Sequence, residues 1–342
     1  MDNAGEVLLL SRDDVNKVLT AKDCIERCVD TFRWVGEGKV TQVNPVNLYL
    51  QSRDEPEPPF GHGILQAFPA EIKPLKVGGV KWLGGYRLNR KRGLPAISAI
   101  DIINDTETAM PLAIVDGTSV TNMRTAGHAG VGAKYLARKN SNVIAIIGCG
   151  HEGRTHLRVM NELFGVEEVR IFDVVPEMAT AFQTDMSADL KLNIKIYDSV
   201  QAAVDGADVV CIVTTATEPV LVAEWVKPGC HVCACTGYRD VDHACGLQFD
   251  KWVVGWYGRD LEWIEGPEVG KIGGLKPGRL CRKDIYADLA TEIIPGKKPA
   301  RESDQERTIM THLGMPALDA AVAALVYEKA KEQGVGTTFK VF

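Results

Sequence analysis

Two patterns of apolar residues follow one another in the first third of the chain. Ser11 and Thr20 each precede a helical pattern, and a hydroxyl at that position accepts a hydrogen bond from a free backbone N–H of the first helical turn. After Thr20 the apolar residues recur every three to four positions, which predicts a helix with one buried face. Between Val40 and about Val115 short strands and turns take over, with strands expected at 77–83 and 96–103. This region is predicted to be an α+β block.

A regular alternation of strands and helices begins at Asn142. Strands are expected at 143–147, 169–172, 194–197, 209–213, 231–234 and 252–254, and helices at 124–138, 152–163, 178–190 and 315–332. Almost continuous apolar strands separated by amphipathic helices are typical of a parallel sheet that is covered on both faces. The predicted fold class is therefore α/β: a Rossmann-type, doubly wound parallel sheet together with an α+β domain.

The size and charge of the chain limit its class. A length of 342 residues suggests two domains, at about 150 residues per domain. The net charge of −6 argues against a general nucleic-acid-binding protein, which needs a basic face for the phosphates. No run of about 18 apolar residues is present that could cross a membrane, and the first residues lack the basic region of a signal peptide. We expect neither a nucleic-acid nor a membrane partner.

The nine cysteines are an odd number spread over a long chain, unlike a disulfide framework. This favours a reducing compartment, and a cytoplasmic protein is expected. Cys230, Cys233, Cys235 and Cys245 cluster in sequence, but Cys230 and Cys233 form one Cys-x-x-Cys without a second pair at that spacing. Cys233 and Cys235 instead fall on one face of a predicted strand, as small core residues. No metal site is expected.

A glycine-rich turn carries the clearest chemical signal. Gly148, Gly150 and Gly153 form a G-x-G-x-x-G motif directly after an apolar strand and at the start of a helix. In this context Gly148 permits a tight turn, Gly150 lets a pyrophosphate approach the backbone, and Gly153 lets helix and strand pack closely. The free N–H groups at the helix start stabilise phosphate charge. The motif therefore predicts a dinucleotide cofactor.

Residues at the ends of later strands refine this prediction. Asp173 ends the next strand, about twenty residues beyond the last glycine, where a carboxylate accepts hydrogen bonds from the adenosine ribose. No Arg or Lys follows directly, so a 2′-phosphate would meet a negative charge without a cation, which favours NAD(H) over NADP(H). Thr214 and Thr215 end a later strand, at the edge where such sheets bind ligands.

Two cationic residues admit both a structural and a functional interpretation. Lys81 lies inside an apolar strand, between Val80 and Trp82, where it either extends its amine to solvent from one sheet face or binds a substrate carboxylate. Arg124 starts a helix rich in small residues, where it is either a structural ion-pair partner or a second carboxylate ligand. Spacing alone does not decide between the two.

Several motifs of this chain are less generic when taken together. They are Val80-Lys81-Trp, Gly93-Leu-Pro95, Asp116-Gly117 followed by Thr121-x-x-Arg124-Thr125, the Gly148 turn, Gly296-Lys-Lys-Pro299-x-Arg301 and the segment that begins Leu318-Asp319. With them the chain resembles the ornithine cyclodeaminase/mu-crystallin family over nearly its whole length. The resemblance implies a central Rossmann domain and a second domain, built from both chain ends, that makes a homodimer. We therefore expect an NAD-binding domain over 125–315 and a substrate-binding and dimerisation domain over 1–124 and 316–342.

The chemistry implied by the resemblance is hydride transfer between a nicotinamide and the α-carbon of an amino acid or its imine. By the same analogy Lys81 and Arg124 bind the α-carboxylate, which holds the α-carbon in place. The expected cofactor contacts are the three glycines with Asp173, Thr214 and Thr215, and in addition Thr121, Thr125, His151 and Glu152.

Two departures from the family pattern bear on the substrate. Where the family usually has an Arg as a further carboxylate ligand, this chain has Asn47, which can donate a hydrogen bond but brings no charge. Where cyclodeaminases carry an Asp for the side-chain amine, this chain has Arg239, or Asp240 if one residue is inserted. An Arg would repel an ornithine δ-ammonium and attract an anionic side chain. A dicarboxylic imine, such as one derived from oxaloacetate, is therefore one candidate substrate.

His128 lies four residues after Arg124, on the same helical face, where the family often has a small residue. It is either the proton donor to a reacting nitrogen or a packing residue. His62 is a further candidate for this proton donor.

The sequence thus predicts an NAD(H)-dependent imine reductase or amino-acid dehydrogenase that acts on a small α-imino or amino acid. Two alternatives stay open. One is a redox-neutral, ornithine-type cyclodeaminase that releases ammonia, and the other is a small-molecule-binding, crystallin-like protein without turnover.

Overall fold

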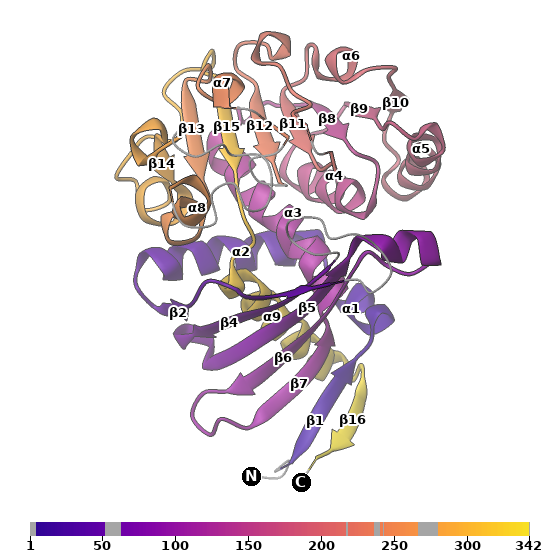
Figure 1. The fold of residues 1–342 in the computed structure, drawn as a ribbon, viewed down its shortest axis with the longest axis vertical. Coiled ribbons are helices and arrows are strands. Elements are labelled where there is room, and N and C mark those ends of the chain that lie inside the picture. Colours follow the sequence, from indigo (N-terminus) through magenta and orange to yellow (C-terminus); the bar gives the residue numbers. More distant parts are fainter. Residues whose placement is uncertain are drawn as a thin grey trace. The chain divides into compact units, whose positions relative to one another are not determined.

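The computed structural model describes residues 5–51, 63–216, 218–235, 240–241, 243–265 and 280–341. The chain divides into two compact units, of which the first comprises residues 1–124 and 314–342 and the second residues 125–313. Each unit has its own sheet, and the colours of Figure 1 show that the first contains both ends of the sequence. The chain returns to the first unit at Gly314. The sequence analysis expected this return at residue 316, two residues later.

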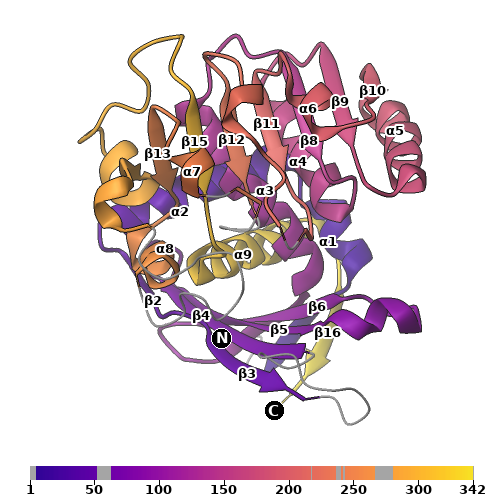
Figure 2. The ribbon, with the colours of Figure 1, turned by 45° about the horizontal axis from the view of Figure 1, so that its top comes forward.

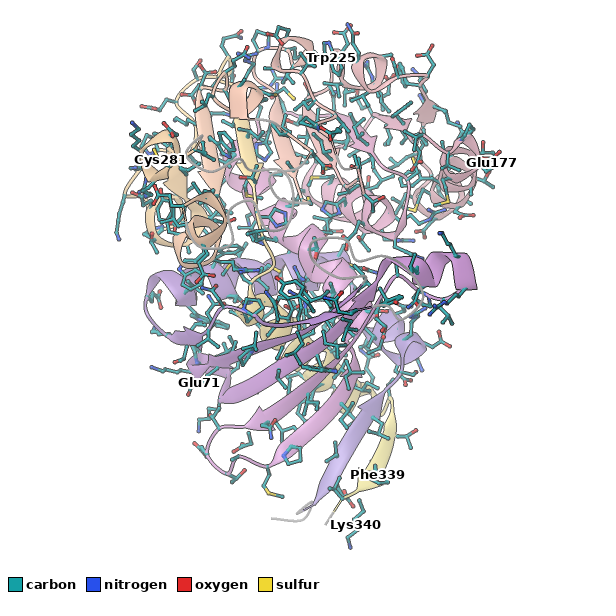
Figure 3. The ribbon with its side chains drawn as sticks, in the orientation of Figure 1. Glu71, Glu177, Trp225, Cys281, Phe339 and Lys340 are labelled. Atoms are coloured by element: carbon teal, nitrogen blue, oxygen red, sulfur yellow. The ribbon has the colours of Figure 1, made fainter. Side chains whose placement is uncertain are left out.

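The first unit is a largely antiparallel sheet with helices. Its strands are β1 (Glu6–Leu10), β2 (Val40–Gln42), β3 (Val46–Leu50), β4 (Gly63–Ile72), β5 (Val77–Tyr86), β6 (Ile97–Asp105), β7 (Pro111–Asp116) and β16 (Thr337–Lys340). They lie in the order β16-β1-β7-β6-β5-β4-β2, with β3 also paired to β4, and β1 and β7 are parallel. Figure 3 labels Phe339 and Lys340 on the edge strand β16.

Among the described residues, three α-helices belong wholly to this unit: α1 (Arg12–Val18), α2 (Ala21–Gly36) and α9 (Pro316–Gln333). Two short 3-10 helices, η1 (Lys73–Leu75) and η2 (Arg87–Arg92), flank β5. The two expected caps are confirmed, since the Ser11 hydroxyl accepts from Asp14 N at 3.3 Å and the Thr20 hydroxyl accepts from Asp23 N at 3.2 Å. Helix α9 packs across β4 and β5, as Figure 2 shows.

The register of this sheet determines which residues share a face. Phe68, Lys81 and Asp101 lie directly opposite one another on β4, β5 and β6. Lys81 and Asp101 are buried, whereas the next residues along these strands, Trp82 and Ile100, are exposed. One face is therefore a core face and the other an open, partly apolar face.

The second unit holds a parallel sheet. Its strands are β8 (Val143–Ile147), β9 (Glu168–Phe172), β10 (Ile194–Ile196), β11 (Val209–Ile212), β12 (His231–Ala234), β13 (Lys251–Val254), β14 (Ala287–Asp288) and β15 (Thr308–Thr311). They lie in the order β10-β9-β8-β11-β12-β15-β13-β14, which can be followed in Figure 1. The chain runs outward from β8 to β10 and then returns to β11 on the other side of β8. This reversal is the point where such sheets bind ligands, at the carboxyl ends of the strands.

The helices of this unit are α4 (His151–Leu163), α5 (Pro176–Leu190), α6 (Val200–Val204), α7 (His243–Gly246) and α8 (Tyr257–Ile264), with 3-10 helices η3 (Ala223–Trp225) and η4 (Arg282–Asp284) and the π-helix η5 (Leu289–Ile293). Helix α3 (Gly117–Leu136) begins in the first unit and ends in the second. Along β8, Ile144 and Ile146 belong to one buried cluster, and Ala145 and Ile147 to another. The sheet is thus covered on both faces, and the predicted doubly wound α/β class is confirmed.

Helix α3 and strand β15 are two of the elements that differ from the sequence prediction. Helix α3 starts at Gly117 rather than at residue 124, because the Asp116 carboxylate accepts hydrogen bonds from Thr118 N and Ser119 N and so caps the helix early. Strand β15 was not predicted, yet it lies between β12 and β13. Its threonines at 308 and 311 are fully buried, although threonine at a strand end reads as polar in sequence.

Candidate functional site

The glycine turn after β8 has the properties that a dinucleotide requires. Gly148 adopts a φ of 104°, and a Cβ at this position would lie 2.7 Å from the Val213 carbonyl oxygen at the end of β11. A Cβ on Gly153 would collide with the Gly148 carbonyl oxygen, so helix and strand pack as closely as expected. Gly150, the N-cap of α4, has no side-chain cap and no atom within 4 Å of an added Cβ. The residues present therefore fit a pyrophosphate at the start of α4.

Asp173 is held in one orientation at the end of β9. Its carboxylate accepts a hydrogen bond from Cys149 N at 2.7 Å and one from Val175 N at 2.9 Å. The first of these donors belongs to the glycine turn itself. The turn and the acid predicted to bind ribose are therefore linked directly.

Thr214 lies beyond the end of β11, where its hydroxyl donates to Asp240 Oδ1 at 2.7 Å and accepts from Ala216 N at 3.0 Å. Asp240 is fully buried. Thr215 and His151 are exposed, and Glu152, Thr121 and Thr125 are half-buried. Of these predicted residues, the structure thus brings together Thr214 and Asp240.

A buried group of charges occupies the core face of the first sheet. Lys81 Nζ on β5 and Arg124 Nε on α3 both donate to the same oxygen of Asp319 on α9, at 2.8 Å and 2.7 Å. Lys81 Nζ also lies 4.2 Å from the centre of the Phe68 ring. The two cations predicted to act together are therefore brought to one point, by an acid to which the sequence pattern gave no role.

The environment of Lys81 changes its ionisation. Burial, and next the positive charge of Arg124, lower the pKa of Lys81 to about 8, although Asp319 and Asp101 act in the opposite direction. Lys81 therefore keeps its charge at neutral pH and loses it in the mildly alkaline range. An amine with this pKa can bind a carboxylate and respond to small pH changes.

Asn47 lies on the same face of the sheet as Lys81. It is paired with Gln66 on β4, which is opposite Leu83, two residues from Lys81 on β5. Its side-chain oxygen accepts a hydrogen bond from Gln66 Nε2 at 2.7 Å. Asn47 is therefore held with its amide group on the core face.

His128 is buried in the second unit, where its ring lies against that of His312 with centroids 3.9 Å apart. His312 directly follows β15, and Gly255 directly follows β13, with no room for a Cβ beside the His128 ring. The sequence offered no reason to single out His312, because β15 itself was not predicted. Arg239 and His62 lie outside the described residues.

Membrane and metal binding can be examined within the described part of the chain. None of its helices is long and apolar enough to span a bilayer. Over the same described ranges, His, Cys, Asp and Glu side chains form no group of three or more that could hold a metal ion, and the nine cysteines are free thiols.

Comparison with known proteins agrees with this geometry. The family model "Ornithine cyclodeaminase/mu-crystallin family" matches residues 6–334. The chain belongs to this family. It is 33% identical to an alanine dehydrogenase of Archaeoglobus fulgidus, over 98% of this chain and 99% of the relative. The resemblance inferred from the Lys81, Arg124 and Gly148 motifs is thereby confirmed.

Two solved structures share the whole fold. One is the Δ1-pyrroline-2-carboxylate reductase of Thermococcus litoralis in complex with NADH and L-proline, with a TM-score of 0.85, 32% identity, and coverage of 97% of this chain and 99% of that chain. The other is an archaeal alanine dehydrogenase dimer with bound NAD, with a TM-score of 0.85, 31% identity, and coverage of 98% and 100%. In both relatives, NAD or NADH is the bound cofactor.

Proposed function

We propose that this protein is an NAD(H)-dependent imine reductase or amino-acid dehydrogenase, in which each unit binds one reactant. The observation that carries the proposal is the convergence of Lys81 and Arg124 on one carboxylate oxygen of Asp319. Two buried cations that already share a carboxylate are suited to hold the α-carboxylate of an amino or imino acid. The glycine turn of the second unit, with its uncapped helix start, is suited to the pyrophosphate of the cofactor.

The residues of the first unit position the substrate. Lys81 and Arg124 neutralise the α-carboxylate, and fixing that group restricts the α-carbon to one place. Their burial excludes water, which strengthens each charge-assisted hydrogen bond. The nicotinamide, when bound, supplies or accepts the hydride. For the proton that the nitrogen gains or loses we propose His128, which lies four residues after Arg124 on helix α3.

NAD(H) is the proposed cofactor in preference to NADP(H). The Asp173 carboxylate is fixed by two backbone N–H groups, and the two residues after it are valines. A ribose 2′-hydroxyl would donate to this carboxylate, whereas a 2′-phosphate would be repelled by it. This preference is tested by comparing kcat/KM for NADH and NADPH.

The side chain of the substrate is a narrower proposal. Arg239 would attract a second carboxylate, which makes an imine of oxaloacetate a candidate beside small apolar imino acids. Replacing Arg239 by alanine is expected to raise KM for the dicarboxylic imine at least about tenfold and to leave KM for a monocarboxylic imine within about twofold. An equal effect on both imines would remove this part of the proposal.

A reducing compartment such as the cytoplasm is proposed for this protein, because its nine cysteines are free thiols. Fractionation of the source cells tests this assignment.

The proposed activity is tested by following NADH absorbance with purified protein. The substrates are pyruvate, glyoxylate and oxaloacetate, each with ammonia or methylamine, and a preformed cyclic imine. Amine-dependent consumption of NADH is the expected result. If no substrate consumes NADH, the proposal fails, and release of ammonia from ornithine with catalytic NAD would then identify a cyclodeaminase.

A further inference from the structure

Asp101 is a buried acid whose oxygens make no hydrogen bond. It lies on the core face of β6, opposite Lys81 on β5, and is 1% exposed. Both of its carboxyl oxygens are buried, and neither has a hydrogen-bond partner within the described part of the chain. A buried carboxylate that is ionised and without hydrogen bonds is costly, whereas the neutral acid is tolerated far better.

The hydrogen bonds of the neighbouring polar groups go to other acids. Lys81 and Arg124 donate to Asp319 Oδ1, and the first free N–H groups of α3 donate to Asp116 at the end of β7. A Cβ added to Gly117 would lie 2.8 Å from Asp101 Oδ2, so the carboxyl group reaches the start of α3 but does not cap it. Asp319 and Asp116 are thus the acids with ionic or capping roles, and Asp101 has neither.

The charges facing Asp101 come from four other elements. These are Lys81 on β5, Arg124 on α3, Asp319 on α9 and Asp116 on β7. Burial, and next the negative charge of Asp319, raise the pKa of Asp101 well above its ordinary value, while Lys81 and Arg124 oppose the shift. The neutral form is therefore favoured by the same geometry that leaves the oxygens without donors.

The protonation of Asp101 determines the net charge of the site. The charge of Asp116 is paired with Arg12 at 3.8 Å and is left out of the sum. With Asp101 neutral, Lys81, Arg124 and Asp319 leave a surplus of one positive charge, which an α-carboxylate would balance. With Asp101 ionised the group is already neutral, and a carboxylate would add an uncompensated buried charge. We propose that Asp101 is the neutral acid of this site and that an α-carboxylate binds only while Asp101 carries its proton. The part of this inference that concerns binding of an α-carboxylate rests on the proposed function.

Replacing Asp319 or Asp101 by asparagine is then expected to have different effects on the pH at which KM rises. Asp319 is ionised and stabilises the Lys81 ammonium, so Asp319→Asn is expected to move the alkaline rise in KM to lower pH. Asp101 is neutral in the binding form, so Asp101→Asn removes no negative charge and does not move this rise to lower pH. The two variants are matched controls for each other, because each exchanges one buried carboxyl group for an amide.

The first experiment needs no substrate. Infrared spectra of the protein labelled with ¹³C at its aspartate carboxyl groups are recorded at neutral pH for the wild type, D101N and D319N. A carbonyl band of a protonated acid is expected in the wild type and not in D101N. In D319N the band is expected to be weaker, because the charge of Asp319 helps to raise the pKa of Asp101. Absence of the band from the wild type, or its survival in D101N, would overturn the inference. The wild-type band is measurable even if a variant fails to fold.

The second experiment follows KM for the imine that consumes NADH, from neutral to alkaline pH. The alkaline rise is expected at lower pH in D319N than in the wild type, and not at lower pH in D101N. A shift to lower pH in D101N would show that Asp101 is an ionised partner of Lys81 and would overturn the inference. Were no imine reduced at all, the infrared band would still decide the state of Asp101, which separates the two failures.

Discussion

Replacing Lys81 by methionine keeps a side chain of similar length in its buried place and removes the charge. Arg124 alone would then hold the substrate carboxylate, and loss of one charge-assisted hydrogen bond is expected to lower kcat/KM by about 10- to 100-fold. NADH binding, measured by fluorescence titration, is expected to stay unchanged because the glycine turn belongs to the other unit.

The matched control is Lys76→Met in the turn before β5. Lys76 is exposed and bonded to Glu107, so its replacement is expected to change kcat/KM less than about twofold. A twofold or smaller loss in Lys81→Met would contradict the carboxylate-binding role.

The glycines of the turn give a second contrast at the scale of single residues. Gly150→Ala meets no atom within 4 Å, so it is expected to fold like the wild type and to bind NADH at least about tenfold more weakly, by obstructing the pyrophosphate. Gly148→Ala combines a φ of 104° with a close contact to Val213, and is expected to lower the melting temperature as well. Unchanged NADH affinity in Gly150→Ala would exclude the cofactor from this turn.

The sequence made some of these residues visible and hid others. Lys81 stands out as a cation within an apolar strand, and the glycines stand out by their spacing. Asp319 does not, because its role depends on how α9 packs on β5, far away in the sequence. Asp101 left a weak signal, since it follows the same strand alternation as the buried Ala99 and Ile103.

At the scale of elements, two buried histidines are expected to make the second unit sensitive to acid. Burial lowers the pKa of His231 on β12 to about 3, with Arg301 adding to the effect, and burial lowers the pKa of His156 on α4 to about 4. Both are neutral in the folded state, whereas in the unfolded chain each gains a proton below about pH 6.5. The stability that depends on these neutral histidines is therefore fully present above pH 6.5. It is lost as the pH falls through about 4 for His156 and about 3 for His231.

This linkage is measurable in the free energy of unfolding against pH. Each histidine is expected to contribute a slope of up to about 1.4 kcal/mol per pH unit in that window. His156→Gln removes one such proton, so it is expected to reduce the slope by up to about 1.4 kcal/mol per pH unit. An identical slope in wild type and variant would mean that His156 is not held neutral.

Periodicity predicted most of the described strands of the second unit, because fully buried strands are nearly continuous apolar runs. It failed for β15, whose two buried threonines satisfy their hydroxyls inside the protein. The Thr308 hydroxyl bonds to His231 Nδ1 at 2.8 Å, and the Thr311 hydroxyl accepts from Trp252 Nε1 at 2.9 Å. It also placed the start of α3 too late, because the cap formed by Asp116 was not recognised.

At the scale of the whole molecule, we propose a homodimer formed through the open face of the first sheet. Val46, Ala67, Trp82 and Ile100 lie in one row across four strands on this face, and Val46, Trp82 and Ile100 are exposed. Exposed apolar residues grouped on one sheet face are typical of an interface.

Trp82→Glu is therefore expected to weaken self-association at least about tenfold, as measured by analytical ultracentrifugation. Phe339→Glu, which places the same charge at an exposed aromatic residue of the edge strand β16, is the control and is expected to have no such effect. A Trp82→Glu protein that stays dimeric would place the interface elsewhere.

The proposed reaction transfers a hydride between the nicotinamide and the substrate α-carbon. It is tested most directly by running the reaction with NADH that carries deuterium at the transferring position, and by locating the label in the amino-acid product by mass spectrometry. One deuterium on the α-carbon of each product molecule is expected. Product without deuterium at that carbon, or cyclised product formed without net loss of NADH, would contradict it.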